Sequence, residues 1–316
     1  MVDQRRYRLK NAEMVSYKAA RKTKDFVLGI FVAVLLIGVV YTILAPVIGI
    51  ISLSFMSVED VFNPTVFVVP ISPSLMNIRY AIRFMDYWTV LARTLVYSLG
   101  MGLLHVLVAS FVGYGFARYR FWGNKFFFGL VLFTIIIPVQ AYMAPLFMHF
   151  RFFGPTDINL LNSFASIIIL TSVGMGLRSG LFIYIFRQFF RGLPVEISEA
   201  AFIDGAGPMR TYATVIMPNA MPAIITVLML ALVWHYGDTF YSGILLGNTR
   251  FVHVAVGGIF AAFMVYRGNL PTDINQMEAQ MAAFAGVVLV IAPILLIYSV
   301  LQRRFIEGIE RSGIVG

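Results

Sequence analysis

The sequence lacks cysteine altogether, and charged residues are scarce. The absence of cysteine excludes a disulfide framework, a thiolate metal site and a cysteine nucleophile. Asp, Glu, Lys and Arg make up only 12% of the 316 residues, whereas about 25% is usual for a soluble domain. Too little polar surface is left to cover a water-soluble globule. The hydrophobic share of 59% and the mean hydropathy of +0.84 therefore indicate a membrane protein.

The signatures of catalysis and nucleotide binding are also missing. No glycine-rich phosphate loop ending in Gly-Lys-Ser/Thr occurs, so we predict that the chain binds no ATP itself. The four histidines show no metal-ligand spacing, and no catalytic constellation can be argued from scattered single residues. We therefore expect no catalytic residue, no metal and no enzyme activity.

Six apolar stretches are long enough to cross the hydrocarbon as helices, which takes about 20 residues. They cover residues 26–56, 90–117, 126–150, 164–189, 220–246 and 281–301. The first is too long for the core of a signal peptide, so we expect it to be retained. The predicted fold is an all-α, polytopic membrane bundle of six transmembrane helices.

Lys and Arg are distributed unevenly between these stretches. Residues 1–25 contain eight, and seventeen of the 24 lie on the side that this segment defines. Because basic residues favour the cytoplasmic side, both termini are predicted to be cytoplasmic. The predicted divisions are a basic amino-terminal segment (1–25), a six-span domain (26–306) and a cytoplasmic tail (307–316).

Three outer segments follow from this orientation. Residues 57–89 and 248–280 are long, and residues 151–162 are short. The long segments either contact a soluble extracytoplasmic partner or simply connect helices.

The longest polar inner loop, residues 191–219 (the polar loop), has the signals of ordered structure. Pro194 suits the start of a helix, and Glu199 falls near its positive end. Gly205 and Gly207, followed by Pro208, then stop that helix. A second helical stretch is expected to end at Pro218.

Small and acidic side chains fit the polar loop for docking a partner. Ala200, Ala201, Gly205 and Ala206 would leave a smooth face, while Glu199 and Asp204 offer charges to a partner's groove. The alternative is an amphipathic helix that lies on lipid. Residues 192–209 contain three acids and no base, which argues against docking to anionic lipid.

The segment EAAFIDGAGPMRTYATVIMP resembles the coupling motif of binding-protein-dependent ABC importer permeases. The matching positions are Glu199, Ala200, Ala201, Gly205 and Pro218, with Val215 and Met217 as apolar departures. The resemblance implies that this loop contacts an ATP-hydrolysing subunit.

Further segments resemble the maltose- and glycerol-phosphate-type carbohydrate permeases, over roughly residues 75–316. They include GYGFARYRFWGNKFFF, TIIIPVQAYMAPLF and LQRRFIEGIERSGIVG. The resemblance implies a type I importer fold in a prokaryotic inner membrane. It also implies a second permease subunit, two ATP-binding subunits that hold ATP and Mg, and an extracytoplasmic solute-binding protein. No nucleic acid partner is expected.

Polar and aromatic residues inside the apolar stretches are candidates for a solute path. Charged groups there usually face a cavity or a partner. The candidates are Gln140, Arg178, Trp234, Asp238 and Tyr241, with Tyr236 beside them. The alternative is an internal Arg178–Asp238 pair, or snorkelling, with ordinary interfacial aromatics. His105 is predicted to be a buried, hydrogen-bonded residue, and Pro138, Pro145 and the glycines of the fourth stretch either mark a gate or are tolerated kinks.

The leading prediction is thus a permease subunit of an ABC importer for a sugar or oligosaccharide. An ion-driven secondary carrier is the alternative, but it would want several acids within the spans, and Asp238 is the clear case. A non-transporting membrane scaffold is a third possibility. The solute stays open among monosaccharides, oligosaccharides and polyol phosphates.

Overall fold

The structure is a computed structural model that describes residues 2–247, 249–268 and 273–313. Side chains of residues 1–21, 23 and 304–316 fall outside the described part, and so do the predictions on the basic amino-terminal side chains and on the tail. The chain folds into two compact units, which are Met1–Ser74 and Leu75–Gly316.

The first unit contains α1 (Val2–Phe55) and α2 (Val58–Phe62). Lys24–Phe55 of α1 is long and apolar enough to cross a membrane, which agrees with the first predicted span. The Ser57 side chain accepts a hydrogen bond from the Asp60 backbone N–H at 3.1 Å and so caps α2. The buried Asp60 carboxylate in turn accepts from the Ser72 N–H at 2.8 Å, which fixes the following loop.

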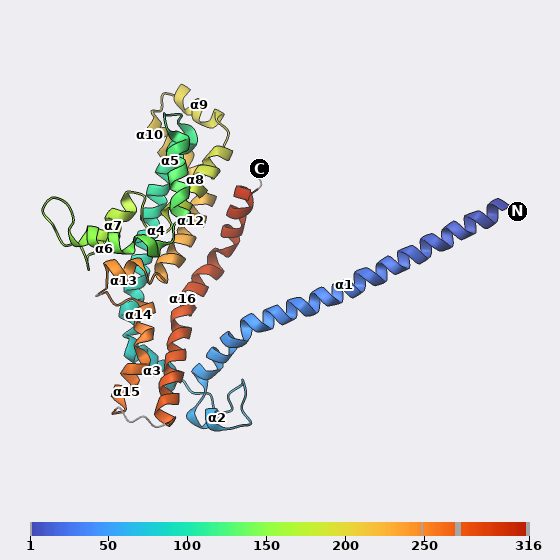
Figure 1. Ribbon diagram of the computed structural model, residues 1–316, viewed down its shortest axis with the longest axis horizontal. Helices are drawn as coiled ribbons and strands as arrows, with labels where there is room; N and C mark the ends of the chain where they lie inside the picture. Colours follow the sequence, from blue (N-terminus) through green and yellow to red (C-terminus); the bar gives the residue numbers. More distant parts are fainter. Residues whose placement is uncertain (1, 248, 269–272, 314–316) are drawn as a thin grey trace. The chain divides into compact units, whose positions relative to one another are not determined.

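The second unit is built from helices. In chain order they are α3 (Met76–Met85), α4 (Tyr87–Arg118), α5 (Asn124–Ile136), η1 (Val139–Tyr142), α6 (Met143–Arg151), α7 (Phe164–Ser172), α8 (Ser179–Gly192), α9 (Glu196–Ile203), α10 (Pro208–Thr211), η2 (Tyr212–Ile216), α11 (Met217–Asn219), α12 (Met221–Tyr236), α13 (Tyr241–Leu245), α14 (Val252–Gly257), α15 (Ile259–Tyr266) and α16 (Asp273–Gly313) (Figure 1).

Three helices in the described residues could each cross a membrane, and the number rises to five if each bent pair forms one span. The straight ones are in α1, α4 and α16. The third predicted span bends by 104° between α5 and the η1–α6 segment, and a 79° bend separates Pro208–Asn219 from α12. The fourth predicted span is divided into α7 and α8. The helical membrane fold is confirmed, while the count of six spans stays a prediction.

Proline and left-handed residues account for these breaks. Ile137 is extended, as the residue before Pro138 tends to be, and α5 ends there. Pro145 lies within α6 and breaks nothing. Between α7 and α8, Gly174 and Arg178 have positive φ of 75° and 58°, a conformation that an α-helix does not contain.

Pro293 lies inside α16 without ending the helix, and a tyrosine replaces the hydrogen bond that it removes. Pro293 has no N–H, so the carbonyl of Leu289 loses its partner within the helix. The Tyr87 hydroxyl donates to that carbonyl at 3.0 Å, and the Tyr236 hydroxyl donates to the Val290 carbonyl at 2.7 Å. These two bonds attach α4 and α12 to α16.

The middle of the second unit is the packing of α4 against α8 and α12. Its buried residues include Phe182, Phe186 and Phe190 of α8 and Val227 of α12. Gly113 of α4 allows the close approach of α8. A Cβ at Gly113 would lie 2.8 Å from the Phe186 Cβ and 3.0 Å from the Arg187 backbone nitrogen.

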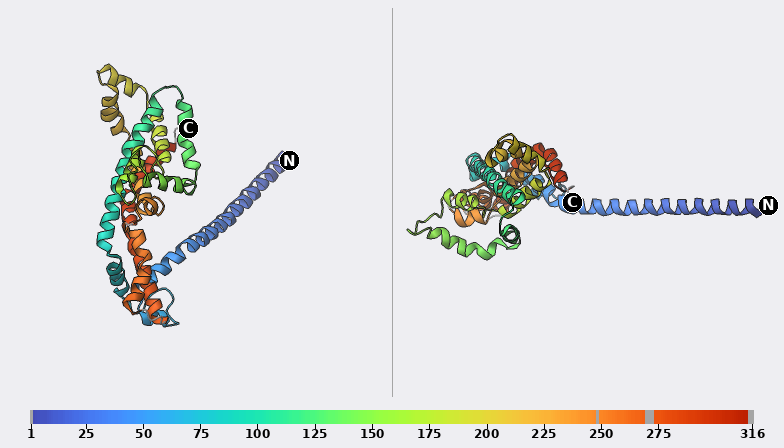
Figure 2. Two further views of the ribbon diagram at one scale, coloured as in Figure 1. Left: turned by 60° about the vertical axis from the view of Figure 1, so that its left-hand side comes forward. Right: turned by 90° about the horizontal axis from the view of Figure 1, so that it is seen from above.

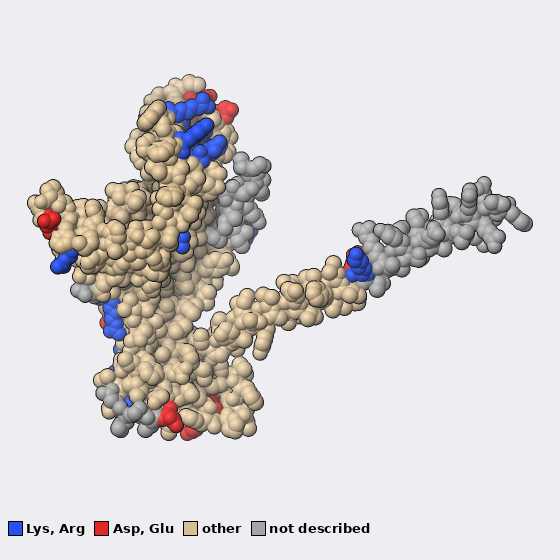
Figure 3. Space-filling view, viewed as in Figure 1, with Lys and Arg blue, Asp and Glu red and all other residues tan. Residues whose placement is uncertain are grey.

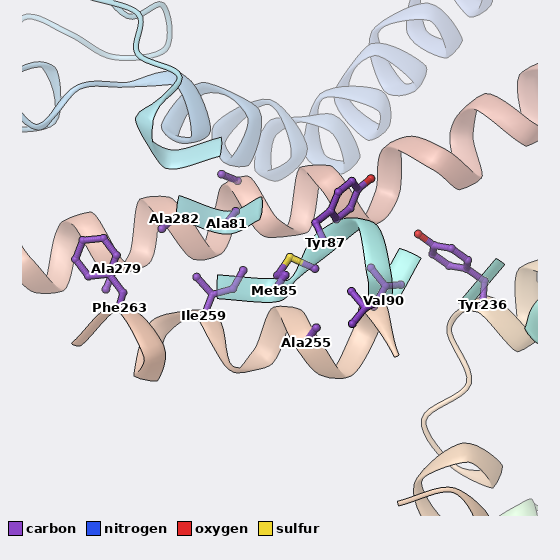
Figure 4. Packing of buried hydrophobic residues seen from close by; sticks show 12 residues of the cluster. Ala81, Met85, Tyr87, Val90, Tyr236, Ala255, Ile259, Phe263, Ala279 and Ala282 are labelled. Carbon is purple, nitrogen blue, oxygen red and sulfur yellow. The ribbon is translucent and has the colours of Figure 1, made fainter. Parts of the chain in front are cut away.

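Parts of the two long outer segments are helical and packed. α3, α14 and α15 pack against the start of α16 around Met85, Ile259, Phe263 and Ala282 (Figure 4). The Arg250 side chain donates to the Phe84 carbonyl at 2.9 Å, which links the two segments. Whether this layer contacts a soluble partner stays a prediction.

The two ends of the second unit carry different elements. α9 and α10 lie at one end, and α3 and α15 lie at the other, as Figure 1 and the left view of Figure 2 both show. The polar loop is thus separated by the length of α4 from the layer that contains α3.

The contact at Gly113 gives a test of the α4–α8 packing. We expect Gly113→Ala to lower the stability of the folded protein by roughly 1–3 kcal/mol, as overpacking of a tight interface does. Gly115→Ala, two residues along α4, meets no atom within 4 Å and is the matched control. Thermal unfolding of both purified variants checks this, and equal melting temperatures would contradict the packing.

Candidate functional site

A cavity of about 720 Å³ opens where the third and fourth predicted spans are broken. Its wall is formed by the end of α5, by η1 and α6, by the turn before α8, and by Phe240 and Tyr241. Ligand pockets commonly have volumes of about 300–1,000 Å³. The helix breaks therefore create a space large enough for a small solute.

Three of the five solute-path candidates lie on this wall: Gln140, Arg178 and Tyr241. Gln140 lies in η1, directly after the Pro138 break. Arg178 is the N-cap residue of α8, and its side chain is exposed. The Tyr241 hydroxyl is 2.6 Å from the Tyr142 hydroxyl, so one donates to the other across the cavity wall.

The other two candidates lie behind the wall. The Trp234 ring has the Arg178 guanidinium 5.4 Å from its centroid. Asp238 is buried, and its carboxylate accepts from the backbone N–H groups of Phe240, Tyr241 and Ser242 at 3.0, 3.1 and 2.8 Å. It thereby caps α13 and makes no ion pair with Arg178. Tyr236 is committed to α16, as described above.

His105 and His235 form a buried pair between α4 and α12. Their Nε2 atoms are 3.0 Å apart, so one ring must donate and the other accept. Ser179 lies 3.4 Å from His105 Nδ1, and the Tyr97 hydroxyl lies 3.3 Å from His235 Nδ1. The prediction that His105 is a buried, hydrogen-bonded residue is confirmed.

Sequence reasoning missed several polar residues of the cavity wall, among them Thr134, Tyr142, His149 and Ser179. None of them is charged within a span, so none had an individual signal. The signal that could have located most of them is their place in the sequence, next to a residue that breaks a helix. Thr134, Tyr142 and Ser179 each lie within about one helical turn of a break that Pro138 or the turn before α8 produces, whereas His149 has no such signal.

The first helix of the polar loop begins and ends as its residues require. Glu196 and Glu199 lie in the first turn of α9. At its end, Gly205 has φ of 79°, its N–H bonds to the Phe202 carbonyl, and the Ala206 N–H bonds to the Ala201 carbonyl. This is a Schellman motif, which favours glycine at the left-handed position.

One face of α9 is buried against the protein and the other is exposed. Ser198 and Ala201 are buried within the chain, so Ala201 is not on the exposed face, and its contact with a partner stays a prediction. Glu199 and Ala200 are exposed, and Ile203 is 86% exposed. Asp204 is also exposed, and Ala206 is half-buried. An apolar and acidic surface therefore points away from the protein.

The rest of the polar loop returns to α12 through three short helical segments. α10 is followed by the π-helical η2 and then by α11, which contains Pro218 and ends one residue later than predicted. The hydroxyls of Tyr212 and Ser110 are 2.8 Å apart, and Arg118 donates to the Leu193 carbonyl at 2.9 Å. Both bonds attach the loop to α4. Lys and Arg side chains gather at this end (Figure 3).

This arrangement has a counterpart in a known family. The family described as binding-protein-dependent transport system inner membrane component matches residues 105–311, and the chain belongs to it. The matched residues contain both the cavity and the polar loop. The chain is thus a multi-pass membrane permease of an ABC importer, as the coupling-motif resemblance predicted.

Individual relatives agree over most of the chain. A probable ABC transporter permease protein of Pyrococcus horikoshii is 27% identical, over 86% of this chain and 92% of its own. The maltodextrin transport system permease protein MdxG of Bacillus subtilis is 28% identical, over 71% and 74%. The crystal structure of a bacterial ABC transporter involved in the import of the acidic polysaccharide alginate contains a chain with a TM-score of 0.73. That chain is 26% identical and matches 89% of this chain and 98% of its own.

The contacts of Asp238 generate a prediction that separates capping from solute binding. Asp238→Ala leaves three backbone N–H groups without an acceptor and should destabilise the protein by about 1–2 kcal/mol. Asp238→Asn keeps a side-chain oxygen acceptor and should lose less stability. Thermal unfolding measures both. If Asp238→Ala unfolds at the wild-type temperature but loses solute binding, the capping role is wrong.

Proposed function

We propose that this permease translocates a saccharide, delivered by an extracytoplasmic solute-binding protein and driven by ATP hydrolysis on partner subunits. The observation that carries the coupling is the outward face of α9, with its exposed Glu199 and Ile203. The saccharide class is supported by relatives whose names state maltodextrin, arabinooligosaccharide and diacetylchitobiose transport.

The proposed assembly contains a second permease subunit and two ATP-binding subunits that hold ATP and Mg. Exposed apolar side chains on the polar loop support a protein partner there. They are Val195, Phe202, Ile203 and Met209. Such a patch beside acidic residues fits a protein groove better than an anionic lipid surface. In the proposed orientation both termini and the polar loop are cytoplasmic.

Coupling in this proposal is a two-state process. ATP closes the partner dimer, α9 moves with the groove that holds it, and the spans change from inward-facing to outward-facing. The bonds of Arg118 to Leu193 and of Tyr212 to Ser110 would transmit that motion to α4. Chemistry remains with the partner subunits, because this chain supplies only the mechanical link.

An ion-driven carrier is not favoured by the site. Such a carrier would need titratable acids free to exchange protons within the spans. Asp238, the clear candidate, is held by three backbone N–H groups.

Placing a positive charge at Glu199 or at Gly205 tests the proposed coupling. We expect Glu199→Arg and Gly205→Arg to leave the protein inserted but to abolish ATP-driven uptake, because each places a bulky cation on the docking surface. Gly205→Arg also forces a side chain into a left-handed conformation. Uptake into proteoliposomes and co-purification of the ATPase are the measurements.

Glu59→Arg is the matched control, because it reverses an exposed acid in the first turn of another helix, α2. The Glu59→Arg variant should still co-purify with the ATPase and take up solute. Normal uptake by stably expressed Glu199→Arg or Gly205→Arg would disprove the coupling role. The saccharide class would be disproved if the cognate binding protein retained a ligand of another class on purification.

A further inference from the structure

Arg178 places a positive charge on the wall of the cavity without a matching acid. Among the described residues that form this wall there is no Asp or Glu. Polar groups on the wall are otherwise neutral hydroxyl and amide groups and the His149 imidazole. The wall thus has an unbalanced cationic group beside neutral hydrogen-bonding partners.

Asp238, the acid that the sequence offered as a partner for Arg178, is already engaged. Asp238 directs its two carboxylate oxygens to three backbone N–H groups. Arg178 instead lies against the Trp234 ring, 5.4 Å from its centroid. A ring face stabilises a guanidinium in position but does not neutralise it. The internal ion pair that the sequence left open is therefore absent between these two residues.

The backbone around Arg178 adds to the positive potential. Arg178 caps the 14-residue helix α8, and Ser179, Gly180 and Leu181 of its first turn also line the cavity. The first turn of a helix carries partial positive charge on its N–H groups. The guanidinium and the helix end therefore act on the same space.

We infer that the solute accepted by this cavity is an acidic saccharide, carrying a carboxylate or phosphate that Arg178 pairs with. This inference rests on the proposed saccharide transport. A planar guanidinium binds either anion through two parallel hydrogen bonds. Gln140 and the Tyr142–Tyr241 hydroxyl pair would bond sugar hydroxyls on the same wall.

The test compares pairs of ligands that share a sugar skeleton, of which one member carries the anionic group and the other does not. Binding of trigalacturonate and of its full methyl ester is measured by calorimetry on the assembled transporter in lipid nanodiscs. A disaccharide phosphate and its parent disaccharide form a second pair, which distinguishes phosphate from carboxylate. We expect the charged member of at least one pair to bind about tenfold more tightly.

Variants assign the preference to Arg178. Arg178→Gln should reduce it to less than about threefold and leave the affinity for the uncharged member unchanged, and Arg178→Lys should retain most of it. Arg151→Gln is the matched control, because Arg151 also lies over a ring, that of Phe152, but not on the cavity wall. It should behave as the wild type.

Equal affinities within both pairs, or a preference that survives Arg178→Gln, would overturn the inference. ATP-driven uptake of neutral saccharides alone would overturn it too, while supporting the proposed function. A complex with active ATPase subunits that takes up no saccharide of either pair, and whose binding protein retains a ligand of another class, would overturn the proposed function itself.

Discussion

Inside a bilayer, every backbone N–H and C=O must find a partner within the protein, because lipid offers none. Two features of the second unit meet this constraint where the regular helical hydrogen bonding is lost. The Tyr87 hydroxyl bonds the carbonyl that Pro293 leaves free, and the Asp238 carboxylate bonds three N–H groups where α12 gives way to α13. Side-chain hydrogen bonds thus satisfy backbone groups at these two points.

The cavity is a consequence of those breaks. Where α5 stops before Pro138 and α7 stops before Arg178, the spans do not fill the space that straight helices would occupy. The polar residues of the wall come both from the breaks, as Arg178 does, and from the helices beside them, as Thr134 and Ser179 do. The cavity and the helix breaks are therefore one feature of this fold, and Arg178 belongs to both.

In the polar loop, the local sequence decides where the helix ends, and packing decides which of its residues are exposed. The helix stop at Gly205 could be predicted, because only the local backbone decides a Schellman motif. Which residues form the exposed face of α9 could not be predicted. Ala200 and Ala201 are adjacent and chemically identical, and only the packing of α9 against its own chain buries the second of them. The exposed face of α9 accordingly contains Glu199, Ala200 and Ile203.

The sequence by itself determined the membrane class, the positions of the three straight spans and the helix stop in the polar loop, because hydropathy, proline and glycine act over short ranges. Tertiary structure decided the roles of the two charged residues within the predicted spans, Arg178 and Asp238. Arg178 and Asp238 looked alike as buried charges, yet one lines the cavity and the other caps a helix. Such roles depend on which groups from distant segments meet, and spacing along the chain does not encode those distances.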